Sequence, residues 1–237
     1  MKKLLLSTLA TFSCIFTIVQ AQWSVGVSAG YTNNEFYTNI SNYDYNYYKK
    51  KGGFVVSVPV KYAITKWFAV QGEPGYIQKS FSLVQELPTN PRTKLTSHYN
   101  YLQLPLMAHF NFGINKWMGF VNIGGYGSYW LSGHIKGTEL DGFNFPSYPA
   151  TVNTTQSVDG KYEFDSRRDR RLQWGWLAGI GLQYSLNKKL SLFAEGRYAE
   201  DLTDQQKNYM RGQIPRYNIT TSVTAGCFYH LPFNKQK

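Results

Sequence analysis

Ser132 and His134 are the two side chains whose types and spacing come nearest to catalytic chemistry. They stand two positions apart in a segment of alternating apolar and polar residues, with Glu139 and Asp141 shortly after. In a strand, two such positions share one face. A serine activated by a histidine, itself oriented by a carboxylate, attacks acyl groups, so the alternative is an outer membrane lipid A hydrolase or acyltransferase. Because Ser-x-His is a common spacing, a non-enzymatic protein is the favoured interpretation.

No other residues suggest chemistry, and we expect no metal and no cofactor. The remaining histidines, His98, His109 and His230, stand in separate segments and make no local ligand set. The glycine-rich run at 124–127 lies inside a strand-like segment, where glycine eases packing and curvature. No phosphate-binding fingerprint accompanies it.

Eight segments alternate apolar residues with small or polar ones, and a period of two is typical of β-strands. They span 23–31, 53–64, 67–76, 102–112, 118–131, 172–184, 190–198 and 217–231. Most are long enough to cross a bilayer when tilted. Their polar faces carry mainly small residues and amides, which suit the narrow interior of an eight-stranded barrel.

The connectors between these segments are unequal. Those at 64–67, 114–117 and 186–189 are short and similar, whereas the others are long and rich in Tyr, Asn and charge. Short turns at one end and long loops at the other are typical of outer membrane barrels, as are aromatic belts at the segment ends. We therefore predict an all-β fold, an eight-stranded antiparallel up-and-down transmembrane β-barrel. A soluble exported barrel that binds a small apolar ligand is the alternative.

Residues 1–21 are predicted to be a cleaved signal peptide. Two lysines precede an apolar run at 4–19, and Ala21 suits cleavage before Gln22. An uncleaved membrane anchor is the competing reading. The mature chain, 22–237, then forms one barrel domain in the bacterial outer membrane.

Five charged or titratable side chains fall on the predicted inner face of the barrel. They are Lys61, Glu73, His109, Glu195 and Arg197. An isolated ion in a nearly closed lumen carries a large desolvation penalty, so we expect these groups to pair into a network that plugs the lumen. A path for substrate or protons is the alternative.

Basic residues gather in two long connectors, and the formal net charge of the chain is +11. One group is Lys49, Lys50 and Lys51, and the other is Arg167, Arg168, Arg170 and Arg171. Because guanidinium binds phosphate with two parallel hydrogen bonds, these groups suit lipopolysaccharide or a surface partner. Simple solvation of the loops is the general alternative. For the lysines, a Tyr-rich hairpin that extends the first two strands beyond the membrane is the favoured interpretation, and for the arginines the alternative is partial neutralisation by Asp165 and Asp169. An exported chain meets little nucleic acid, and we expect none as a partner.

Two motifs resemble a known family. The segment 101–106 (YLQLPL) resembles a motif midway through the PorT-like outer membrane β-barrels of Bacteroidota. The segment 193–198 (FAEGRY), followed by Asp201-Leu202-Thr203, is similar to that family's penultimate strand and its exit. The resemblance implies a porin-family architecture like that of OmpA- and OmpX-type barrels. It transfers no functional residue, because most members have no assigned activity, although one branch is associated with the type IX secretion system.

The sequence therefore predicts a non-enzymatic outer membrane barrel with a largely plugged lumen. Its expected role is envelope-structural, surface-interacting or secretion-associated. The expected partners are outer membrane lipid, lipopolysaccharide, the barrel assembly machinery during biogenesis, and a secretion-system or surface partner.

Overall fold

The computed structural model describes residues 22–38, 46–85, 93–140, 155–209, 211 and 215–231. The predicted signal peptide, Asp141 and the last six residues lie outside these ranges. Within them, no helix has the length and apolar character needed to span a membrane. All the regular elements are strands.

Eleven strands are present in the described ranges. They are β1 (Gln22–Thr38), β2 (Asn46–Ser57), β3 (Val60–Ala63), β4 (Phe68–Gly72), β5 (Gly75–Gln85), β6 (Thr93–Ile114), β7 (Trp117–Leu140), β8 (Thr155–Lys161), β9 (Leu172–Ser185), β10 (Leu190–Asp201) and β11 (Arg216–His230).

Ten of these strands form a closed antiparallel ring of eight wall positions, which confirms the predicted barrel. β11 pairs with β1 and closes the ring, while β2 continues into β3 and β4 into β5. Both breaks fall at a proline, Pro59 and Pro74, because proline has no N–H for the ladder. Their carbonyls still accept bonds from neighbouring strands, from Gly26 at 2.8 Å and from Val58 at 2.9 Å. The wall is therefore continuous through the breaks.

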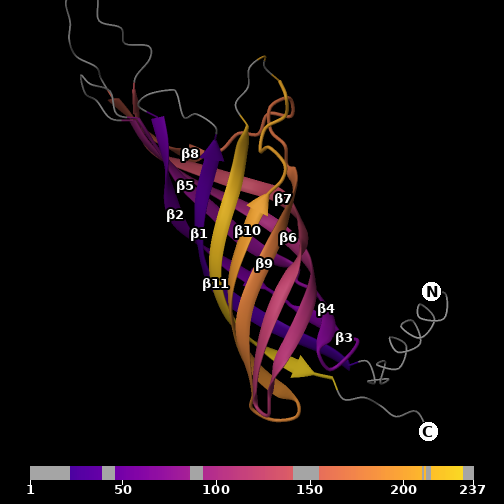
Figure 1. Ribbon diagram of the computed structural model, residues 1–237. Coiled ribbons are helices and arrows are strands. Elements are labelled where there is room, and N and C mark those ends of the chain that lie inside the picture. The colour runs from indigo at the N-terminus through magenta and orange to yellow at the C-terminus, as the bar shows by residue number, and fades with distance from the viewer. Residues whose placement is uncertain are drawn as a thin grey trace, which may run out of the picture.

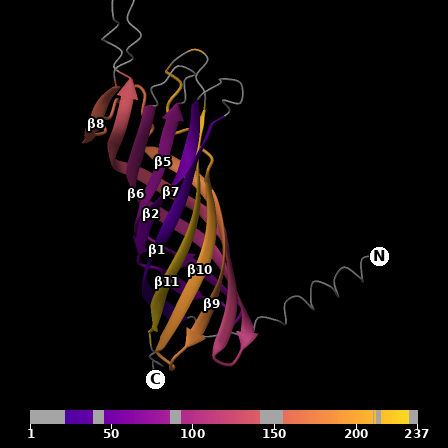
Figure 2. The ribbon, with the colours of Figure 1, turned by 90° about the vertical axis from the view of Figure 1, so that its left-hand side faces the viewer.

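β8 is the one described strand outside the ring. It pairs only with the far part of β7, from His134 to Leu140. Figure 1 shows it at the end of the barrel opposite β3 and β4, and Figure 2 places it there from the side. The sequence interpretation placed no strand between residues 131 and 172 and was wrong in part, because this region contains the end of β7 and all of β8.

The strands are longer than a membrane requires. β6 has 22 residues and β7 has 24, whereas a tilted membrane strand needs roughly 9–11. β1 likewise continues to Thr38, beyond the predicted end at residue 31. The excess lies at the end with the long connectors, so the wall projects beyond the bilayer on that side.

The three short connectors form the tight turns that the sequence predicts. Asn115 adopts a left-handed conformation with φ of 64°, which suits a two-residue hairpin turn. In the other two turns a side chain accepts backbone N–H bonds. Thr65 Oγ1 accepts from Phe68 at 2.9 Å, and Asn187 Oδ1 accepts from Lys189 at 2.8 Å.

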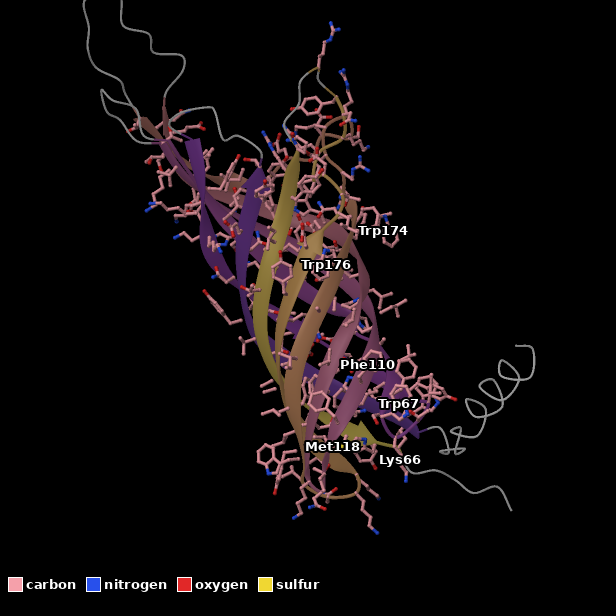
Figure 3. All side chains as sticks on the ribbon, viewed as in Figure 1. Lys66, Trp67, Phe110, Met118, Trp174 and Trp176 are labelled. Atoms are coloured by element: carbon pink, nitrogen blue, oxygen red, sulfur yellow. The ribbon has the colours of Figure 1, made fainter. Side chains whose placement is uncertain are left out.

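The apolar face of the wall points outward and the polar face inward. Leu106, Ile180 and Val223 are each at least 60% exposed on the outer surface, whereas buried Ser, Asn and Gln side chains line the interior. Figure 3 shows Trp174 and Trp176 towards one end and Trp67 and Phe110 towards the tight turns, which matches two aromatic belts. This arrangement is the reverse of a soluble ligand-binding barrel and suits a lipid environment.

Candidate functional site: the barrel lumen and its outer mouth

An arginine and two glutamates meet across the lumen and form a first charged layer. Arg197 Nη2 lies 2.8 Å from Glu73 Oε2 and 2.8 Å from Glu195 Oε2, and Arg197 Nε donates to Glu195 Oε1 at 3.1 Å. Glu195 and Arg197 are two positions apart on β10, so both side chains point inward. Glu73 reaches them from the break between β4 and β5. All three side chains are at most 10% exposed.

Lys61 and His109 join the same layer through neutral partners. Lys61 Nζ lies 3.3 Å from His109 Nε2 and 3.1 Å from Gln183 Oε1. His109 Nδ1 lies 2.6 Å from Asn122 Oδ1, and Asn122 Nδ2 donates to Glu195 at 3.0 Å. The structure thus brings together all five lumen residues singled out in the sequence. Lys61 forms no ion pair within the described residues; instead its ammonium lies over an aromatic ring.

A second charged layer lies nearer the outer mouth, and the sequence analysis missed it. Lys79 Nζ donates to Asp201 Oδ1 at 2.8 Å, and each side chain is only 1% exposed. Asp201 also accepts bonds from the Tyr126 hydroxyl and from Asn218 Nδ2. The sequence feature that could have revealed this layer is the continued alternation after residue 76, the predicted end of the strand. Ile77 and Lys79 both point inward there and are buried.

The two basic groups expected at the outer end lie on different parts of the wall. Lys49, Lys50 and Lys51 belong to β2, next to β1 and β5, whereas the arginines precede β9, next to β7 and β10. Lys50 pairs with Glu35 at 2.7 Å. They do not form one continuous patch.

The four arginines differ in their surroundings. Arg167 is exposed, and Arg168 is paired with Asp169 at 2.9 Å. Arg170 is half-buried. The guanidinium of Arg171 lies 4.6 Å from the ring centre of Tyr129, an exposed residue of the outer aromatic belt. Arg171 Nε and Nη2 also donate to the Trp130 and Leu131 carbonyls at 3.0 and 3.3 Å, so Arg171 stands beside the outer aromatic belt with part of its guanidinium already bonded.

Ser132 and His134 do not form a catalytic arrangement with Glu139. Ser132 Oγ accepts a bond from Asn100 Nδ2 at 3.1 Å, while His134 Nε2 lies 2.7 Å from Asp159 on β8. Glu139 instead accepts a bond from a glutamine of β8. No hydrogen bond joins the serine to the histidine in the part of the chain that the structure describes.

The described residues contain no group of three or more His, Cys, Asp and Glu side chains arranged to hold a metal ion. The lumen layers hold carboxylates, but arginine and lysine occupy the positions that a cation would take. In both layers the carboxylates are bonded to neighbouring side chains.

Residues 19–206 match the family described as outer membrane protein β-barrel domain. The match spans most of the chain, and the chain belongs to this family. No curated protein sequence matches it.

Solved structures of bacterial surface and outer membrane proteins align with the chain over most of its length. OprG from Pseudomonas aeruginosa aligns with a TM-score of 0.48 and 8% identity, covering 89% of this chain and 96% of OprG. Neisserial surface protein A (NspA) aligns with a TM-score of 0.44 and 12% identity, covering 89% of this chain and 99% of NspA. The outer membrane protease OmpT from Escherichia coli aligns with a TM-score of 0.47 and 11% identity, covering 89% and 96%.

Proposed function

We propose that this protein is a non-enzymatic outer membrane barrel whose lumen is closed and whose interactions take place at its outer end. The observation that carries the proposal is the pair of charged layers inside the barrel. Arg197 with its two glutamates forms one, and Lys79 with Asp201 forms the other. The role that fits is structural support of the envelope or interaction at the cell surface.

The energetics of buried ions support a lumen that stays closed. Removing one partner from a buried ion pair costs about 3–5 kcal/mol, because the other charge is left without compensation. A passing solute would have to break Lys79 from Asp201 and Arg197 from Glu73 in turn. An eight-stranded barrel also has an interior just wide enough for its own side chains. These costs oppose conduction.

The outer end supports an interacting role. The wall projects beyond the membrane there, and β8 adds a hairpin to it. Arg171 is held next to Tyr129 by bonds from Nε and Nη2 to the Trp130 and Leu131 carbonyls, and its charge at the expected headgroup level fits the phosphates of lipopolysaccharide. Lys49 and Lys51 share one face of β2 and provide a separate basic surface for lipid or a partner, whereas Lys50 pairs with Glu35.

Solute uptake into proteoliposomes tests the closed lumen. Vesicles that contain the folded protein are placed in an isotonic solution of a small sugar and followed by light scattering. A closed barrel leaves the vesicles unchanged, as in protein-free vesicles. Swelling that rises with the amount of protein would overturn the proposal in favour of a pore.

A secretion-associated role is the second candidate, and it is supported by the two motifs that resemble the PorT-like family. The inward-facing residues of the motifs line the lumen in the structure: Tyr101 is fully buried, Glu195 and Arg197 form the first layer, and Asp201 belongs to the second. Structural roles thus account for both motifs. A deletion strain that still secretes its full set of proteins would remove this candidate, whereas selective loss of secreted proteins would establish it.

A further inference from the structure

A cavity of about 230 Å³ lies at the outer mouth of the lumen. We call it the outer cavity. It is lined by Phe36, Tyr48, Phe81, Leu83, Leu95, Ser97, Tyr99, Trp130, Ile135, Tyr162, Arg168, Asp169, Gln205, Gln206 and Arg216. Its volume is below the roughly 300–1,000 Å³ of sites for drug-sized ligands, so it suits a molecule with a single ring.

Aromatic rings from five wall strands form much of the cavity lining. Phe36 stacks on Phe81 with ring centres 4.3 Å apart, and Tyr99 lies 4.4 Å from Trp130. Tyr162 packs 4.9 Å from Trp130 and closes this side. Ring faces carry partial negative charge, so they attract the apolar, slightly positive C–H face of a sugar ring.

The segment around Asp169 and the segment around Gln206 hold polar groups over the cavity. Asp169 pairs with Gln206 in an isolated β-bridge, and the Gln205 backbone N–H donates to the Arg216 carbonyl at 2.9 Å. Gln205 reaches inward, where its amide donates to the Tyr101 hydroxyl at 3.2 Å. Ser97 adds a hydroxyl from β6. The Gln206 amide and the Ser97 hydroxyl can bond ligand hydroxyls, whereas the Asp169 carboxylate already accepts bonds from Arg168, Tyr162 and the Asp165 backbone.

The charges of the lining leave one positive charge in excess. Arg168 and Asp169 neutralise each other, since they form an ion pair at 2.9 Å. Arg216 is the remaining charged residue of the lining, and its buried Nε has no hydrogen-bond partner among the described residues. A buried guanidinium donor without a partner favours an anionic acceptor.

We propose that the outer cavity binds an acidic monosaccharide unit, with its ring against the aromatic lining and its carboxylate on Arg216. The inference rests on the proposed surface role, for which it names a partner chemistry. A planar aromatic acid would satisfy Arg216 but would leave the hydrogen-bonding groups of Gln206 and Ser97 without ligand partners. A neutral sugar would leave the guanidinium unpaired. An acidic sugar satisfies both.

Titration calorimetry of the folded full-length protein in detergent micelles tests the proposal with sodium glucuronate as the probe. We expect saturable binding of glucuronate, with glucose and benzoate each at least tenfold weaker. Arg216→Gln should weaken glucuronate binding at least tenfold, because it removes the charged partner. Leu95→Trp, which fills the cavity without touching the charge, should do the same. Arg167→Gln, at an exposed arginine outside the lining, should bind like the wild type.

Three results would overturn the proposal: no saturable binding of glucuronate, equal binding of benzoate, or an unchanged affinity in Arg216→Gln. If Arg216→Gln does not fold, two other measurements test the proposal. The wild type should bind glucuronate more tightly than glucose, and Leu95→Trp should weaken the binding of glucuronate. The vesicle-swelling result is independent of this one. A closed barrel that fails to bind glucuronate therefore overturns the sugar site alone.

Discussion

Lys79 and Asp201 are 122 positions apart in the chain and form an ion pair at 2.8 Å in which each side chain is only 1% exposed. β5 contributes the lysine and β10 the aspartate, from separate parts of the wall. Tyr126 and Asn218 donate further bonds to the same carboxylate. The aspartate is therefore the centre around which four wall strands meet.

Loss of one partner of this pair should destabilise the barrel strongly. We expect Lys79→Met to lower the free energy of unfolding by about 3–5 kcal/mol, because Asp201 is left buried and uncompensated. Lys79→Met combined with Asp201→Leu should lose less than the sum of the single variants. Reversible urea unfolding in lipid vesicles, followed by tryptophan fluorescence, measures both.

The exposed pair Lys50–Glu35 is the matched control. Its side chains are 58% and 40% exposed, so Lys50→Met should cost under about 1 kcal/mol. A Lys79→Met variant as stable as Lys50→Met would show that the inner pair contributes nothing to the fold.

A methyl group added at Gly179 should disturb the first layer. Its Cβ would collide with the carboxylate of Glu195, which Arg197 and Asn122 hold in place. We expect Gly179→Ala to cost about 1–3 kcal/mol, the usual range for overpacking. Gly196→Ala on the adjacent strand is the control, since a Cβ there meets nothing within 4 Å. Equal stability of the two variants in urea would contradict the described geometry.

The outer segment at 165–171 should loosen in acid. Burial alone would raise the pKa of Asp169, but hydrogen bonds from Arg168, the Asp165 backbone and Tyr162 outweigh it and hold this pKa below its ordinary value of 3.8. A carboxyl with a lowered pKa stabilises the fold fully above the ordinary value and loses that contribution as the pH falls below it. Hydrogen exchange, corrected for intrinsic rates, should show protection of this segment declining below pH 3.8.

Asp169→Asn mimics the protonated form, so its segment should be less protected than the wild-type segment above pH 3.8, and this difference should disappear as the pH falls and the wild-type carboxyl becomes protonated. Asp159→Asn, on β8, should leave the segment as in the wild type. Protection that stays constant from neutral pH down to well below 3.8 would mean that the carboxylate does not hold this segment.

Ser132→Ala and His134→Ala should leave lipid A unchanged. The histidine is bonded to Asp159, and the serine accepts a bond from Asn100. Mass spectra of lipid A from strains that express the wild type and each variant provide the measurement. An acyl-chain difference that depends on both residues would establish the enzymatic alternative instead.

The sequence predicts the part of the barrel inside the membrane well, because lipid forces apolar residues to alternate outward. Leu102, Leu104 and Leu106 mark β6 in this way, and inward residues such as Glu195 and Arg197 are identified by the same alternation. The lipid-facing positions therefore make both the wall strands and the first charged layer predictable from the sequence.

The part above the membrane follows no such rule, since its outer face meets water. On β1, the apolar Phe36 is buried while the neighbouring charged Glu35 is partly exposed. In the part of the wall inside the membrane, by contrast, the apolar side chains point outward and the polar ones inward. On β5, both Lys79 and Ser80 are buried. A search for alternating outward apolar residues therefore ends the strands too early. It misses the second charged layer and the aromatic residues of the outer cavity.

Single-channel recording in planar lipid bilayers is the most direct test of the closed lumen. The folded wild type should give no conductance steps. A variant with alanine at Glu73, Lys79, Arg197 and Asp201, which breaks the ion pairs of both layers and leaves the net charge unchanged, should give steps once its folding is verified by heat-modifiable migration. Stable, protein-dependent steps from the wild type would contradict the account, because the two layers would then not close the barrel.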